Sequence, residues 1–101
     1  MPVNYEDIVR EHLRITLLRL LNEQPDCTLN ESLLTDLSGS YGFSASRDRV
    51  RTELAWLREQ GLVTVDDMCG LMVATLTSRG EDVVCARVVV PGVKRPRPNH
   101  G

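Results

Sequence analysis

Residues 46–76 decide the fold, and they read SRDRVRTELAWLREQGLVTVDDMCGLMVATL. The apolar residues of the first part are spaced as one face of a helix: Val50, Leu54 and Leu57. Gly61 is a typical C-terminal stop, because glycine accepts the left-handed backbone that ends many helices. We therefore predict a helix that begins near Ser44 or Ser46 and ends near Gln60.

The pattern changes from helical to extended after this helix. Residues 62–65 and 71–76 are short runs rich in apolar and β-branched residues, as strands are. Residues 66–70 between them read as a polar turn. The two runs predict a two-stranded hairpin, which needs helices to pack on because an isolated hairpin is marginal in water.

Three further helices are predicted around this unit. The first runs from about Tyr5 to Glu23 with Asn4 as its cap, and the second from about Asn30 to Ser38. The last follows Thr77 and runs through Val83 and Val84 to about Ala86. This order predicts a mainly α domain with a small β-hairpin: a winged helix-turn-helix made of a three-helix bundle, a two-stranded wing and a C-terminal helix.

Charge is unevenly distributed along the 101 residues. Residues 1–86 hold eight arginines and fourteen acidic residues, a net charge of −6, whereas residues 87–101 hold four basic residues and no acidic one, a net charge of +4. Residues 88–101 also contain several prolines and glycines. We predict one winged-helix domain over residues 1–87 and a basic, proline-rich flexible tail over residues 88–101.

The sequence argues against disulfides, a zinc site, an enzyme active site, a signal peptide and a membrane span. The three cysteines are odd in number and form no C-x-x-C pair, which disfavours a disulfide framework and a zinc site. No Ser-His-Asp or Cys-His spacing and no glycine-rich phosphate loop stands out, so we expect no enzyme and no cofactor. The N-terminus lacks the features of a signal peptide, and no stretch approaches the roughly 18 apolar residues of a membrane span. We expect a cytoplasmic protein with no metal and no membrane contact.

Three segments carry a resemblance to known proteins. The run from Ser46 to Val63, with its Leu-x-x-x-Gly-Leu-Val ending, resembles the recognition helix and first wing strand of ArsR-like and MarR-like regulators. The motif from Leu76 to Gly80 resembles the one that follows their wing. The segment VPGVKRP, residues 90–96, makes the chain similar to small winged-helix proteins of Mu-like bacteriophages and prophages. This resemblance implies a winged-helix fold in a bacterial host cell and no settled biochemical role. It also implies no metal sensing, because the metal-sensing cysteine motif is missing.

The start of the predicted 46–60 helix is the candidate DNA-reading element. A recognition helix turns its N-terminal side chains toward base edges in the major groove. Arginine can bind guanine through two hydrogen bonds, and serine and threonine can reach phosphates. We predict contacts with double-stranded DNA from this helix and from the tail: Ser46, Arg47, Arg49, Arg51, Thr52, Lys94, Arg95 and Arg97.

Two observations keep other interpretations open. Arg49 and Glu53 have the i,i+4 spacing of an ion pair, so the arginines can instead form a solvated, salt-bridged face. Asp66 and Asp67 in the predicted wing turn would repel phosphates. The chain is then either a small transcriptional regulator or an adaptor that uses the same fold to bind another phage protein in assembly or DNA packaging.

The first predicted helix has a wide apolar face, which indicates burial on more than one side. We expect a homodimer through this helix, with two recognition helices reaching successive major grooves about 34–36 Å apart. Trp56 lies off the main apolar line of its own helix. We expect it either at an interface or packed against the first helix or the tail.

Overall fold

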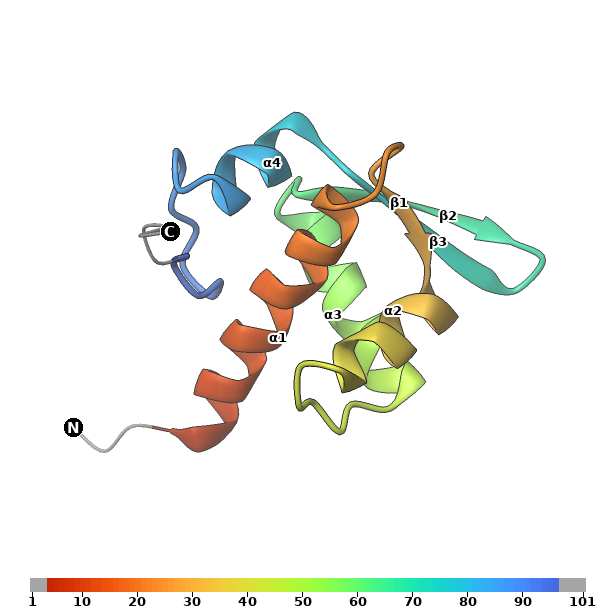
Figure 1. Cartoon of the computed structure of the whole chain (residues 1–101), viewed down its shortest axis with the longest axis horizontal. Helices are drawn as coiled ribbons and strands as arrows, with labels where there is room; N and C mark the ends of the chain where they lie inside the picture. Colours follow the sequence, from red (N-terminus) through yellow and green to blue (C-terminus); the bar gives the residue numbers. More distant parts are fainter. Residues whose placement is uncertain (1–3, 97–101) are drawn as a thin grey trace.

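The computed structural model describes residues 4–96. Its elements in chain order are α1 (Tyr5–Asn22), β1 (Thr28–Asn30), α2 (Glu31–Gly39), α3 (Arg47–Glu59), β2 (Val63–Met68), β3 (Leu71–Leu76) and α4 (Ser78–Val84). The β2–β3 hairpin projects from one side of the α1–α3 bundle, while residues 88–96 lie on the opposite side (Figure 1). The predicted winged helix-turn-helix is confirmed. Within residues 4–96, no helix is long and apolar enough to cross a membrane.

Each helix begins at a polar residue whose side chain accepts a hydrogen bond from a backbone N–H of the first turn. The donor–acceptor distances are 2.8–3.0 Å for Asn4, Asn30, Ser46 and Thr77. Such a cap contributes about 1 kcal/mol to stability. The start of α3 is therefore fixed at Ser46 and not at Ser44.

The sheet has a third strand that the sequence analysis missed. Its order is β1-β3-β2, and β1 pairs antiparallel with β3 through Thr28↔Thr75 and Leu29↔Ala74. The hydroxyls of Thr28 and Thr75 lie 2.9 Å apart. Three residues are too few to show the two-residue period of a strand, so β1 is held by its pairing with β3 and not by a local pattern.

The wing turn is shorter than predicted. Asp66 and Asp67 belong to β2, where they pair with Val73 and Met72. The tip consists of Cys69 and Gly70 alone, with φ angles of 56° and 85°. Two residues with positive φ match the twist of the flanking strands, which explains why the strands continue so close to the turn. Asp66 therefore lies behind the tip, whereas the Asp67 carboxylate accepts a hydrogen bond from Gly70 N at the tip, 2.7 Å long.

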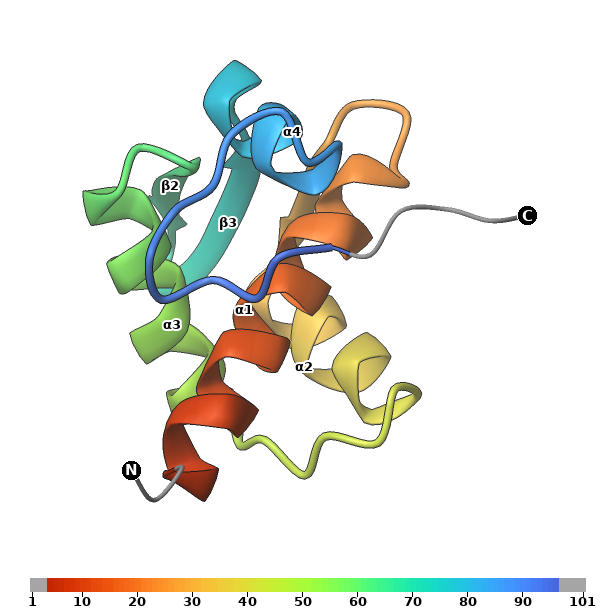
Figure 2. The same ribbon diagram turned by 90° about the vertical axis from the view of Figure 1, so that its left-hand side faces the viewer.

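The apolar face of α1 is covered by its own chain. Its leucines are buried: Leu13, Leu17, Leu18, Leu20 and Leu21. Helices α2 and α3 pack on one side of α1, and α4 and residues 88–96 cover the other (Figure 2). These leucines are therefore unavailable as a dimer surface, and a homodimer through the first helix stays a prediction that its exposed residues would have to serve. The width of the face has an intramolecular cause.

Residues 88–96, here called the C-terminal strap, are packed and not free. Val90 and Val93 are buried in the core. The strap is anchored to α1 by a backbone hydrogen bond from Lys94 N to Glu11 O, 3.2 Å long. The prediction of a flexible tail from residue 88 was wrong for the strap, because its valines supply apolar surface that the proline-rich composition concealed. The rest of the predicted tail, including Arg97, lies outside the described residues.

Trp56 on α3 is the contact point between the strap and the helices. The Arg14 guanidinium stacks over its ring at 3.7 Å from the centroid. Gly92 lies so close that a Cβ placed there would be 2.8 Å from Trp56 Cζ2. Arg14 Nη1 also donates to Gly92 O at 2.9 Å. Of the predicted alternatives for Trp56, the structure shows packing against both the first helix and the strap.

Removing apolar surface from the strap should loosen it from α1 and α3. We expect Val90→Ala/Val93→Ala to lower the free energy of unfolding by about 2–4 kcal/mol, because both side chains are buried. Trp56 is the only tryptophan, so its emission in urea unfolding reports the strap directly. The control is Val89→Ala, since Val89 is 59% exposed, and it should change stability by less than about 0.5 kcal/mol. Equal effects of the two variants would contradict the packing described.

Gly80 in the first turn of α4 should be irreplaceable for a steric reason. A Cβ there would collide with the carbonyl oxygen of Leu62 and lie 2.5 Å from Leu76 Cδ1. We expect Gly80→Ala to cost about 2–3 kcal/mol in thermal or urea unfolding. Gly39→Ala is the matched control, because a Cβ at Gly39 meets nothing within 4 Å. A Gly80→Ala protein as stable as the Gly39→Ala protein would show that α4 can shift away from Leu62 without cost.

Candidate nucleic-acid interface

Glu31, the first residue of α2, lies beneath the surface formed by Arg47 and Arg51, two of the predicted DNA-binding arginines. Its side chain is fully buried. Arg47 Nε donates to Glu31 Oε1 at 2.9 Å, and Arg51 Nη1 donates to both carboxylate oxygens at 2.9 and 3.1 Å. The backbone N–H of Met72 donates to Oε2. One carboxylate therefore joins α2, the start of α3 and wing strand β3.

The two arginines keep an outward face. The Arg47 side chain is 52% exposed and that of Arg51 is 40% exposed, although the carboxylate they bind is buried. Arg51 Nη1 also lies 3.5 Å from Gly70 O at the wing tip. Glu31 thus orients both guanidinium groups and leaves part of each accessible to a ligand.

The pKa of Glu31 reflects two opposed effects. Burial alone would raise the pKa of this carboxyl group, because a charge is costly away from water. The hydrogen bonds from Met72 N, Arg47 and Arg51, with the charge of Arg51, oppose burial and hold the pKa below its ordinary value. Glu31 is therefore ionised at neutral pH, as its two arginine partners require.

A second buried carboxylate, Glu53 on α3, holds a different arginine group. Glu53 accepts from Arg14 Nε at 2.7 Å and from Arg49 Nε at 3.2 Å, and Arg10 Nε lies 3.8 Å away. The predicted Arg49–Glu53 pair is confirmed. Arg49 is thereby drawn toward α1, away from the Glu31 group.

The remaining predicted residues divide between two regions. Ser46 uses its hydroxyl to cap α3, and Thr52 is exposed with its hydroxyl donating to Asp48 O at 3.1 Å. Both lie beside Arg47 or Arg51 in the chain. Lys94 and Arg95 lie on the strap, on the opposite side of the molecule from the wing (Figure 1). The structure therefore brings Ser46, Arg47, Arg51 and Thr52 together and keeps the strap residues apart from them.

Sequence reasoning missed Glu31. It reads as an ordinary acidic residue after the Asn30 cap, where a negative charge suits any helix. Its partners are 16, 20 and 41 residues away, so no local spacing marks the contact. Only the folded chain brings them together.

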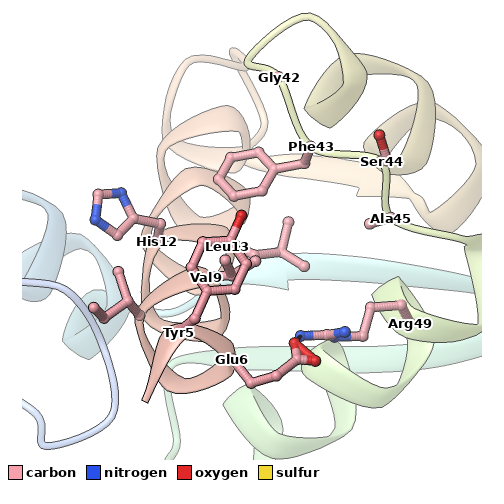
Figure 3. A pocket seen from close by; sticks show the side chains of 11 residues that line it. Tyr5, Glu6, Val9, His12, Leu13, Gly42, Phe43, Ser44, Ala45 and Arg49 are labelled. Carbon is pink, nitrogen blue, oxygen red and sulfur yellow. Dashed lines mark ion pairs between the residues drawn. The ribbon is translucent and has the colours of Figure 1, made fainter. Parts of the chain in front are cut away.

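A pocket of about 480 Å³ opens between the first turns of α1 and the α2–α3 loop. Figure 3 shows Tyr5, Val9 and Phe43 around it, with Glu6 beside Arg49 at one side. Within residues 4–96, no group of three or more His, Cys, Asp or Glu side chains could hold a metal ion. Among the described residues, the buried ion pairs are thus those of Glu31 and Glu53.

No protein-family model matches the chain. The chain is 51% identical over 94 residues to the uncharacterized protein gp26 of Escherichia phage Mu, in an alignment that covers 91% of this chain and 95% of that protein. The chain belongs to the gp26 family. An uncharacterized protein of Haemophilus influenzae is 40% identical over 78 residues, 76% of each chain. The predicted resemblance to small Mu-like phage proteins is confirmed.

Solved structures support the fold of this gp26-family protein. A MarR family transcriptional regulator from Streptomyces coelicolor matches with a TM-score of 0.63 and 26% identity, over 72% of this chain and 48% of that one. A second, crystallised in complex with DNA, matches with a TM-score of 0.63 and 24% identity, over 79% of this chain and 51% of that one. The chain spans about half the length of these regulators, and the likeness shows a shared winged-helix fold.

Replacing Glu31 with a residue that cannot ionise should produce a pH-dependent loss of stability. Because folding lowers the pKa of Glu31, its contribution is fully present above the pKa of the unfolded state and is lost as pH falls through the folded value. We expect Glu31→Gln to cost about 2–3 kcal/mol at pH 7. The difference from wild type should shrink as pH falls below about 4.5, measured by urea unfolding at several pH values.

Glu59→Gln is the matched control for this prediction. Glu59 is exposed on α3 and forms no ion pair within residues 4–96, so its replacement should change little at any pH. A Glu31→Gln deficit that stays constant from pH 7 to pH 3 would show that packing, and not charge, is what Glu31 supplies.

Proposed function

We propose that this gp26-family protein is a small DNA-binding transcriptional regulator that contacts double-stranded DNA with α3 and the wing. One observation carries the proposal: the buried Glu31 carboxylate holds Arg47 and Arg51 side by side at the start of α3, with an exposed face on each. A recognition helix uses these positions to reach base edges and phosphates. We infer a non-enzymatic role in the host cytoplasm.

Orientation by Glu31 favours binding. A free arginine loses up to about 2 kcal/mol of side-chain entropy when a ligand immobilises it. Arg47 and Arg51 are already ordered by their bonds to Glu31, so less of that cost falls on DNA binding. Arg47, Arg51 and Glu31 together carry one net positive charge, and Asp48 in the first turn of α3 adds an exposed carboxylate beside them in the chain. Ser46 and Thr52 flank the two arginines and complete the proposed contact.

Two predicted residue groups are assigned differently in this proposal. Arg49 is left out of the α3 contact because Glu53 holds it toward α1. Lys94 and Arg95 are left out because the strap lies opposite the wing. For a homodimer through α1, the exposed apolar surface lies in its N-terminal turns, where Tyr5 and Ile8 are 77% and 40% exposed. The MarR family regulator solved with DNA supports the winged-helix fold of this chain. The assignment of individual residues rests on the contacts described above.

Neutralising the α3 surface should weaken DNA binding. Removing the arginines alone would leave Glu31 as an uncompensated buried charge, so the test variant is Glu31→Gln/Arg47→Gln/Arg51→Gln. We expect its affinity for phage or prophage DNA fragments to fall at least about tenfold in gel-shift titrations at low salt. Arg79→Gln on α4 lowers the net charge by the same amount and should bind like wild type. Equal DNA affinity of the two variants would contradict the assignment of the DNA contact to α3.

A protein adaptor in phage assembly or DNA packaging is the second candidate function. Asp66 and Asp67 are exposed on β2 next to the wing tip, where carboxylates oppose a phosphate backbone and suit a basic protein partner. This function is favoured if wild type shows no salt-dependent DNA binding and instead copurifies with one defined phage protein from induced cells. That copurification should fail for Asp66→Asn/Asp67→Asn.

A further inference from the structure

Cations without an acidic partner are concentrated on one surface. Within residues 4–96, five basic side chains take part in no ion pair: Arg19, Arg58, Arg79, Lys94 and Arg95. Three of the five, Arg19, Lys94 and Arg95, line a single pocket between α1 and the strap. The arginines at the start of α3 are bound to carboxylates, so the least neutralised positive charge lies elsewhere.

This strap pocket has a volume of about 330 Å³. Its lining consists of His12, Ile15, Thr16, Arg19, Lys94, Arg95 and Pro96. Among the described residues, no acidic side chain lines it. His12, Thr16 and Arg19 are spaced by four and three residues and therefore share one face of α1. The polar groups are guanidinium, ammonium, hydroxyl and imidazole, and this set is suited to an anion.

The pocket is held in place by the packing around it. Lys94 N donates to Glu11 O at 3.2 Å, which fixes the strap to the second turn of α1. Val93 and Pro96 are buried on either side of Lys94 and Arg95. The backbone that carries these two cations is thus anchored at both ends. A ligand would meet an ordered surface and not a free tail.

We infer that the strap pocket binds the phosphate backbone of a second DNA segment, so that one chain bridges two duplexes. The inference rests on the proposed function, because the first duplex would occupy α3 and the wing. The strap and the wing lie on opposite sides of the bundle (Figure 1), so one short duplex face cannot contact both together.

The pocket fits phosphates better than an acidic protein segment. Contacts with phosphates require positive charge and hydrogen-bond donors, and they do not require apolar anchors. A specific protein contact usually needs buried aromatic or aliphatic anchors at its centre. The apolar residues of this pocket, Ile15 and Pro96, are already buried within the chain and offer no such anchor. An acidic peptide is therefore one outcome of the test and not the proposal.

A bead assay tests the bridge with the full chain. One biotinylated duplex is fixed to beads, and capture of a second, fluorescent duplex of the same length is measured. We expect wild type to capture it and Lys94→Gln/Arg95→Gln to capture several-fold less while still binding the fixed duplex. The salt slope of capture should fall by about 2, roughly 0.9 for each lost phosphate contact. Arg58→Gln/Arg79→Gln removes the same charge from outside the pocket and should bridge like wild type.

The opposing outcomes separate the two proposals. Equal capture by both double variants, as expected if bridging came from a homodimer, would overturn the strap pocket and leave the α3 assignment intact. Loss of all duplex binding in Lys94→Gln/Arg95→Gln, with normal binding by Glu31→Gln/Arg47→Gln/Arg51→Gln, would overturn the bridge because the proposed α3 function had failed. Binding of a polyglutamate peptide without duplex capture would overturn it in favour of a protein partner.

Discussion

Two carboxylates buried in a small aliphatic core constrain the whole structure. A buried charge is tolerated only when ion pairs and hydrogen bonds replace the lost water. Glu31 is satisfied by Arg47, Arg51 and Met72 N, and Glu53 by arginines of α1 and α3. Satisfying the first fixes α2, α3 and the wing relative to one another. Satisfying the second fixes α3 against α1, and through Arg14 it reaches the strap as well.

The same constraint sets the electrostatics of the proposed DNA surface. Arginines that neutralise a buried carboxylate add less positive charge than their number suggests, but they are better ordered than free ones. An acidic chain with a net charge of −2 can then present a defined cationic edge without a broad basic face. In the proposed function, specificity for DNA would come from the orientation of Arg47 and Arg51. The basic side chains without an acidic partner would contribute to phosphate binding mainly in the strap pocket.

Local patterns in the sequence were sufficient for the elements and insufficient for the contacts between them. The cap at Asn30, the Gly61 stop and the change of period after it act over a few residues, so the order of helices and hairpin could be predicted. Strand β1 has only three residues and needs β3 as a partner. The role of Glu31 depends on side chains up to 41 residues away, and the strap looked mobile because composition hides Val90 and Val93.

The hydrogen bond from Arg14 to Gly92 spans 78 residues, nearly the full described length. Loop closure on this scale comes late in folding, because contacts distant in sequence cost more chain entropy than local ones. During translation, α1 would emerge before the strap, with one side of its leucine face still uncovered. The native packing of that face cannot be completed until residue 92 has left the ribosome. A segment synthesised late, the strap, is thus what closes over the earlier helix α1.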